Sequence, residues 1–338
     1  MTPEQALLRV IHYLDRAHET GFKAKAFTRA LDVVRSTPPA ELSARAANDT
    51  LTDLDGIGKS TAAVITDALA GREPAYLAKV EAESQVAITA EGQVYRDALK
   101  GDCHLHSMWS DGGAPIEAMA ATAMAIGHEY MVQTDHSARL TIAHGLDEQR
   151  LSDQLDQISA INTDIAAAGH EFRVLAGMEV DILLDGTLDL ADEMLERLDV
   201  VVASVHSKLR MERKEMTERM VMAVASPHVD ILGHCTGRMI GKRPPSDFDA
   251  DSVFAACAQF NTAVEINCRP ERLDPPRELL DQAIEHGCWF SIDTDAHATG
   301  QLEWQALGCD RAAERGVPID KIINTMSADD LLAWTQQS

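Results

Sequence analysis

Histidine and acidic residues recur beside the ends of short apolar runs from residue 101 onward. Neutral imidazoles and carboxylates are the ligands that zinc, manganese and iron take in proteins. In a His-x-His pair at a strand end, both imidazoles lie on one face of the extended chain, because side chains alternate with a period of two. The sequence therefore predicts a metal site. In chain order, the residues beside these ends are His104, His106, Asp111, Asp135, His136, Glu179, His206, His234, Glu265, Asp295 and His297.

The apolar runs themselves have the length and composition of β-strands. They are rich in Val and Ile, and they alternate with amphipathic stretches that predict helices at 115–126, 148–168, 212–225, 249–260 and 277–286. Such alternation predicts a parallel sheet or barrel, in which the carboxyl ends of the strands converge on one face. The first run leads into Cys103, and the others cover 130–133, 172–176, 200–203, 231–232, 263–266 and 289–292.

A single histidine at a strand end is more often a hydrogen-bonded structural residue than a metal ligand. One predicted strand end after another carries His, Asp or Glu in a short motif, however, and chance explains that set poorly. The histidines outside the pattern are interpreted as surface or core residues. They are His12, His18, His128, His170, His228 and His286.

The motifs at the strand ends resemble those of the polymerase and histidinol phosphatase (PHP) domain over about residues 101–325. The resemblance implies a distorted seven-stranded (β/α)7 barrel that hydrolyses phosphoesters with two to three divalent ions of zinc, manganese or iron. The motifs are His104-Leu105-His106, Thr134-Asp135-His136-Ser137, Gly177-Met178-Glu179, Ser204-Val205-His206, Gly233-His234 and Asp295-Ala296-His297. The ligand groups that it implies are His104, His106, Glu179 and Asp295 for one ion, Glu179, His206 and His234 for a second, and Asp111, His136 and His297 for a third.

Within that family, the chain is similar to the version attached to bacterial family X DNA polymerases. Gly233–Arg238 and Glu265–Asp274 carry this likeness, although Cys235 stands where that branch usually has proline. The predicted organisation is a small all-α helix-hairpin-helix domain at 1–83, a linker at 84–100 and the barrel at 101–338. A catalytic palm needs about 100 residues or more, so the linker leaves no room for a polymerase core.

The helical head also resembles those polymerases. Gly21–Phe27 is similar to an early helix of their amino-terminal domain, and Leu54–Lys59 is similar to a helix-hairpin-helix. Glycines let a hairpin backbone approach a phosphate closely, which makes Gly56, Gly58 and Lys59 candidate DNA contacts. A structural turn or a protein contact is the alternative. A P-loop is excluded, because Asp53 stands where that motif requires glycine and no strand precedes it.

Three functions fit these residues. The first is a 3′-5′ exonuclease or end-processing phosphatase acting on DNA, and the second is a phosphatase of a small molecule such as histidinol phosphate or a nucleotide. The third is a non-catalytic binding module. The presence of all nine ligands that the family resemblance implies argues against it. Four residues are candidates for contacts with the phosphate or the leaving group. They are Arg238, which is the leading candidate, and His144, Lys208 and Arg272.

The composition limits the class of protein. The net charge is −24, with −3 over residues 1–95 and −21 over the remainder. This negative charge argues against extensive nucleic-acid binding over the whole surface, and it suggests that bound cations neutralise part of the charge. Apolar runs are too short for a membrane span, and the basic start of a secretory signal is missing. Six scattered cysteines without a CxxC motif predict reduced thiols in a cytoplasmic protein. The sequence leaves the oligomeric state open.

Overall fold

The computed structural model describes residues 1–19 and 21–336, which divide into two compact units. The first unit comprises Met1–Val86 together with Thr299–Gln301, and the second comprises Ala87–Ala298 and the chain from Leu302 onward. No helix of the described residues is long and apolar enough to cross a membrane.

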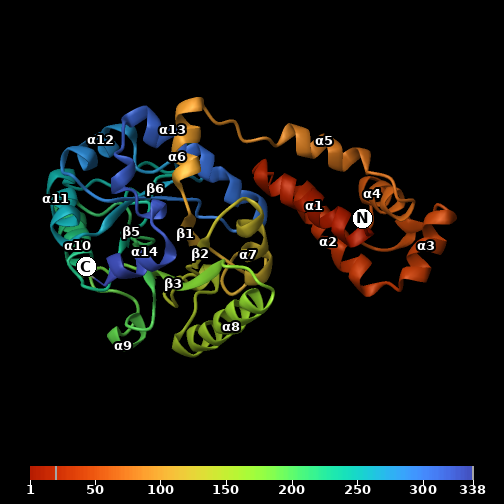
Figure 1. The fold of residues 1–338 in the computed structure, drawn as a ribbon, viewed down its shortest axis with the longest axis horizontal. Coiled ribbons are helices and arrows are strands. Elements are labelled where there is room, and N and C mark those ends of the chain that lie inside the picture. The colour runs from red at the N-terminus through yellow and green to blue at the C-terminus, as the bar shows by residue number, and fades with distance from the viewer. Residues whose placement is uncertain (20, 337–338) are drawn as a thin grey trace. The chain divides into compact units, whose positions relative to one another are not determined.

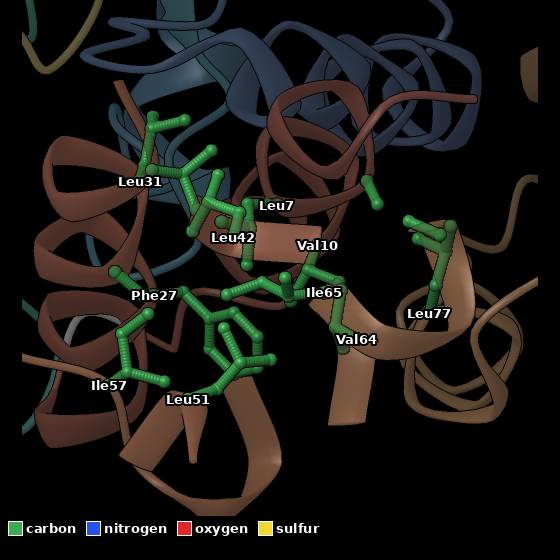
Figure 2. Packing of buried hydrophobic residues seen from close by; sticks show 14 of the residues in the cluster. Leu7, Val10, Phe27, Leu31, Leu42, Leu51, Ile57, Val64, Ile65 and Leu77 are labelled. Atoms are coloured by element: carbon green, nitrogen blue, oxygen red, sulfur yellow. The ribbon is translucent and has the colours of Figure 1, made fainter. Parts of the chain in front are cut away.

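The first unit is helical. Its first helix begins at a capping box, in which Thr2 and Gln5 satisfy each other's backbone N–H groups, and Pro3 stands at the first helical position. Figure 2 shows apolar side chains of these helices meeting in one core, with Leu7, Val10, Phe27 and Ile65 near its middle. The elements are α1 (Pro3–Arg16), α2 (Phe22–Ser36), α3 (Pro39–Ala47), the 3-10 turn η1 (Leu51–Asp53), α4 (Lys59–Leu69) and α5 (Ala75–Glu83).

The segment 84–100 contains a helix, α6 (Ala90–Ala98), that belongs to the second unit. Its N-cap is Thr89, whose side chain accepts a hydrogen bond from the backbone N–H of Gly92. The Tyr95 hydroxyl donates to the carbonyl oxygen of Val317 at 2.8 Å, and Arg96 donates to that of Ile126 at 2.9 Å. These contacts are with residues far away in the sequence, so local patterning gave no sign of them.

The second unit is a (β/α) barrel. Within the described residues, seven strands form one sheet in the order β1 to β7, and every neighbouring pair is parallel. The barrel nearly closes, since His106 N–H donates to the carbonyl oxygen of Ala296 at 2.7 Å and Asp295 N–H to that of His104 at 2.9 Å. The strands are β1 (Gly101–Leu105), β2 (Tyr130–Gln133), β3 (Arg173–Asp181), β4 (Val200–Ser204), β5 (Ile231–Leu232), β6 (Ala263–Asn267) and β7 (Phe290–Asp293).

Helices lie around the outside of the strands (Figure 1). They are α7 (Ile116–Ala125), α8 (Glu148–Ala167), α9 (Asp192–Leu195), α10 (Arg213–Val224), α11 (Ala250–Phe260), α12 (Arg277–Glu285), α13 (Gln305–Arg315) and α14 (Ala328–Thr335), with the short 3-10 segments η2 (Thr141–Ala143), η3 (Thr299–Trp304), η4 (Ile319–Lys321) and η5 (Ile323–Thr325). The α/β fold class predicted from the sequence is confirmed.

The third strand is longer than its apolar run predicts. Gly177 to Asp181 pair in register with Val200 to Ser204 of β4, so Glu179 lies within β3 and not after it. The strand extends this far because the chain on each side continues alongside it. On one side it pairs with β4, and on the other the N–H of Ser137, beyond the end of β2, donates to the carbonyl oxygen of Glu179 at 3.0 Å. This places the Glu179 side chain inside the barrel mouth.

Candidate metal centre

Glu179 lies at the middle of a ring of histidines. Its side chain is fully buried, and imidazole nitrogens approach both of its carboxylate oxygens. Oε1 lies 2.9 Å from His234 Nε2 and 3.1 Å from His206 Nε2, and Oε2 lies 2.8 Å from His136 Nδ1. Two further nitrogens, the Nε2 atoms of His104 and His106, lie 3.4 Å and 3.6 Å from Oε2.

These nitrogens approach Glu179 without forming hydrogen bonds to it. Neither of its oxygens accepts a hydrogen bond of normal geometry from a described residue. Buried polar groups without hydrogen-bond partners are costly, so donor atoms that converge in this way suit a cation bound between them. The imidazole and carboxylate donors fit a first-row divalent ion.

A second group of donors faces the open side of the site. His106, Asp111, His136 and His297 offer ligand atoms that all lie within 4.8 Å of one another. Asp111 Oδ1 lies 3.3 Å from His297 Nε2 and 3.6 Å from His136 Nε2, and its side chain is 35% exposed. A ligand could therefore reach this end of the cluster from solvent.

The two groups are continuous. His106 belongs to both, as one member of the His104, His106 and Glu179 triad. Asp295 joins them, with Oδ1 3.5 Å from His106 Nε2. The structure thus brings together all nine residues that the sequence assigns as ligands, although their division among ions stays a prediction. The nine are His104, His106, Asp111, His136, Glu179, His206, His234, Asp295 and His297.

Charge in the cluster shifts the pKa values of its members. Burial alone would raise the pKa of Glu179, but the imidazoles of His206, His104 and His136 hold it well below its usual range. Conversely, Glu179 outweighs burial at His206 and raises its pKa to about 9. Glu179 is therefore ionised at neutral pH and available as a ligand.

Two carboxylates that sequence reasoning left unassigned orient histidines. Glu265 on β6 accepts a hydrogen bond from His104 Nδ1 at 2.6 Å, which turns Nε2 of that ring toward Glu179. Asp181 at the end of β3 lies 3.3 Å from His206 Nδ1 and accepts the backbone N–H of His206 at 3.1 Å. Carboxylates behind metal-ligating histidines fix the ring orientation and raise the basicity of the ligand.

Asp135 holds the loop that carries Asp111. Its carboxylate accepts the backbone N–H and the hydroxyl of both Ser107 and Ser110, with the Ser107 bonds at 2.8 Å and 2.6 Å. Gln133 and Gln154 donate to the same carboxylate at 2.8 Å and 2.7 Å. The sequence motif places Asp135 beside His136, but only the fold shows that it serves the preceding loop.

The residues proposed to contact phosphate are placed differently from one another. Arg238 donates from Nε to the carbonyl oxygen of Arg272 at 2.7 Å and from Nη2 to that of Leu273, so most of its guanidinium holds a loop. His144 and Lys208 are exposed, and both have positive φ angles. Arg272 lies at the cluster, with Nε 3.1 Å from Asp295 Oδ2. Arg269, which the sequence did not single out, joins it there.

The glycine hairpin of the first unit connects α3 and η1 to α4. Gly56 has a φ of +99°, which favours glycine, and a Cβ there would lie 3.0 Å from Arg29 and Val33. Gly58 and Lys59 are exposed at the start of α4, and a Cβ on Gly58 would meet open space. The first N–H groups of a helix lack intrahelical partners, so this end of α4 is suited to an anion.

The comparisons with known proteins agree with this geometry. Residues 102–267 match the family model of the PHP domain. The chain is 38% identical over 240 residues to the DNA polymerase/3'-5' exonuclease PolX of Bacillus subtilis (strain 168), an alignment covering 71% of this chain and 41% of PolX. It is 29% identical over 163 residues to a probable phosphatase of Aliivibrio fischeri (strain MJ11), covering 46% of this chain and 63% of that protein.

This chain therefore spans less than two thirds of the length of either curated relative. A solved structure of histidinol phosphate phosphatase from Lactococcus lactis subsp. lactis Il1403, complexed with zinc, L-histidinol and phosphate, aligns with a TM-score of 0.47 at 18% identity, covering 65% of this chain and 94% of that one. The family match and the phosphatase relatives support a hydrolase of phosphoester bonds.

Proposed function

We propose that this chain, in which residues 102–267 form a PHP domain, is a metal-dependent phosphoesterase that acts on DNA ends. The observation that carries the proposal is the gathering of nine imidazole and carboxylate side chains around Glu179 at the mouth of the barrel. A donor set of this size serves two to three divalent ions, and zinc, manganese and iron suit it.

The division of ligands follows the family resemblance. His104, His106, Glu179 and Asp295 would hold one ion, Glu179, His206 and His234 a second, and Asp111, His136 and His297 a third. Bound divalent ions supply an activated water and neutralise charge on the phosphoryl oxygens. The protein's own part is to orient these ligands, through Glu265 behind His104 and Asp135 behind the loop of Asp111.

DNA as the substrate is supported by two features. The relative with 38% identity is a DNA polymerase/3'-5' exonuclease, and its alignment covers 71% of this chain. The first unit offers the exposed hairpin at Gly58 and Lys59 as a place to hold a phosphate of the strand. We propose a helix-hairpin-helix domain at 1–83 that binds DNA, leading through 84–100 to a hydrolytic barrel at 101–338.

A small-molecule phosphomonoesterase is the second candidate. The probable phosphatase of A. fischeri favours it, since that alignment covers 46% of this chain. The surface beside the hairpin also favours it, because Asp55 is 91% exposed and pairs with Arg29 at 2.6 Å, leaving little net positive charge there for DNA. The substrate could then be histidinol phosphate or a nucleotide.

The two candidates are separated by the ratio of oligonucleotide turnover to turnover of a small chromogenic phosphoester. Gly58→Val and Lys59→Glu should lower this ratio, since each lost phosphate contact is on the order of 1 kcal/mol, a roughly fivefold change. Lys79→Glu is the matched control. Lys79 is 64% exposed on α5 of the same unit, and this substitution changes the charge by the same amount as Lys59→Glu. Equal ratios in all variants, in folded protein, would favour the small-molecule phosphatase.

A further inference from the structure

Exposed apolar side chains gather on the loops that follow the strands of the barrel. Met108 follows β1, Ile142 follows β2, Leu184 follows β3 and Ile240 follows β5, and each is at least half exposed to solvent. The other large apolar side chains that are exposed on the described second unit lie on the outer helices α6, α10 and α11, and they are Val94, Met222 and Phe260. Because the carboxyl ends of parallel strands meet at one end of a barrel, the first four lie at the same end as the metal centre.

Two of these side chains belong to the loops that carry the exposed donors of the metal centre. Met108 lies between His106 and Asp111 in the chain, and its side chain is 65% exposed. Ile142 is 88% exposed and lies on the loop that follows His136. Asp111 and His136 belong to the donor group that solvent reaches. Met108 and Ile142 together are called the apolar rim below.

The loop that carries Ile142 is fixed in place. It leaves His136 and returns to it, because the N–H of Leu146 donates to the carbonyl oxygen of His136 at 2.7 Å. Between these ends, the N–H of Arg139 donates to the carboxylate of Asp189 at 2.6 Å. A side chain on a fixed loop loses little further freedom when it meets a ligand, so Ile142 is suited to a contact surface.

Arg150 ties this loop to the loop after β1. Its Nη1 donates to the carbonyl oxygens of His144 and Gly145 at 2.6 Å and 3.1 Å. Its Nη2 donates to the carbonyl oxygen of Trp109, which adjoins the apolar rim in the chain. One guanidinium therefore holds the two loops together, and the apolar rim is a single surface beside the exposed donors.

A polar floor and an apolar edge suit different parts of one substrate. Ions held by the imidazoles and carboxylates would attract phosphoryl oxygens. The methyl and methylene groups of the apolar rim gain free energy only by covering an apolar face, such as that of a ring. A nucleobase offers such a face when it is unstacked, as at the end of a single strand.

We propose that the apolar rim binds the unstacked base of the terminal nucleotide whose phosphodiester reaches the metal centre. This inference rests on the proposed function and adds to it the substrate class, a DNA end that is single-stranded. The rim has no hydrogen-bonding groups, so it favours an unstacked base over an empty position without selecting among the four bases.

The test compares two single-stranded oligonucleotides that differ only in the 3′-terminal nucleotide, which carries thymine in one and no base in the other. The initial release of that nucleotide by the metal-loaded full chain gives kcat/KM for each. The wild type should prefer the end with the base. Ile142→Ser and Met108→Ser should each lower this preference about fivefold, through the loss of one apolar contact. Ile142→Leu keeps an apolar side chain and should keep the preference.

Val94→Ser is the matched control. Val94 is 57% exposed on α6, away from the loops that follow the strands, so its loss removes exposed apolar surface without touching the apolar rim. Its preference for the end with the base should equal that of the wild type. Turnover of glycerol phosphate, which has no ring, should be the same in all of these variants and shows that the metal centre is intact.

Three results would overturn the inference. They are equal turnover of the two oligonucleotides by the wild type, a wild-type preference in both Ile142→Ser and Met108→Ser, and an equal loss of preference in Val94→Ser. Hydrolysis of glycerol phosphate without cleavage of either oligonucleotide would overturn it too, while leaving a phosphoesterase. If the metal-loaded wild type hydrolyses none of the three substrates, the proposed function itself fails, which is a separate outcome.

Discussion

Replacing Glu265 with glutamine should weaken metal binding at His104. One oxygen of Glu265 accepts the hydrogen bond from His104 Nδ1 at 2.6 Å. The other accepts the backbone N–H of His234 and, at 3.2 Å, an N–H of the Asn267 amide. A glutamine amide can present its oxygen to one side only, so its NH₂ group must face the donor on the other side. The imidazole of His104 or the backbone of His234 then loses its acceptor.

The size of the effect follows from the role of such partners. Loss of a carboxylate behind a ligating histidine costs about 10- to 100-fold in metal affinity, which is about 1.4–2.7 kcal/mol. A competition titration of the stripped protein against a chelating dye measures this directly. The fold should remain, because glutamine has nearly the same volume as the fully buried glutamate that it replaces.

Asp230→Asn is the matched control for Glu265→Gln. Asp230 is a buried carboxyl next to β5 that accepts the backbone N–H of Val201 at 2.8 Å, with none of the nine predicted ligands among its hydrogen-bond partners in the described chain. It should leave metal affinity unchanged. Wild-type affinity in Glu265→Gln, or an equal loss in Asp230→Asn, would refute the argument that Glu265 orients His104.

Three further predictions concern other parts of the structure. Asp135→Asn places amide hydrogens against the serine and glutamine donors that Asp135 now accepts, so it should release the loop that carries Asp111. A metal titration should then show fewer ions bound per chain, and binding of as many ions as in the wild type would contradict this. Burial raises the pKa of Asp230 to about 8 from an ordinary 3.8. The wild type should therefore lose free energy of unfolding relative to Asp230→Asn as the pH rises from 5 to 8, by up to about 1.4 kcal/mol per pH unit. Urea unfolding measures this, and the same pH dependence of stability in both proteins would contradict the shift. Gly56→Ala should lower the thermal midpoint and Gly58→Ala should not, because only the first has a positive φ and close neighbours, and equal midpoints would count against that account.

The sequence predicted the barrel well because its signals are local. The runs at 130–133 and 231–232 coincide with β2 and β5, and the expected helix at 148–168 differs from α8 by one residue at its end. Strands buried on both faces read as short Val- and Ile-rich runs, and amphipathic helices separate them. The extension of β3 through Glu179 was missed, because it depends on pairing with β4 and not on an apolar run.

The site was predictable where a motif carried it. The His-x-His spacing of His104 and His106 predicts a pair of metal ligands, and the structure places both beside Glu179. The sequence placed Glu265 at a strand end without showing its role behind His104, and it did not single out Arg269, because both roles depend on which strand ends face each other across the barrel.

Dependence of phosphoester hydrolysis on bound metal can be measured by returning metal to chelator-stripped protein. Zinc, manganese and iron are added separately, and bound metal is measured in the same samples. Stripped protein should be inactive, and turnover should return as two to three ions bind. Glu179→Gln, which removes the carboxylate shared by the histidines, should stay inactive at every metal concentration. Stripped protein that keeps its turnover, or Glu179→Gln that hydrolyses the ester as fast as the wild type, would contradict it.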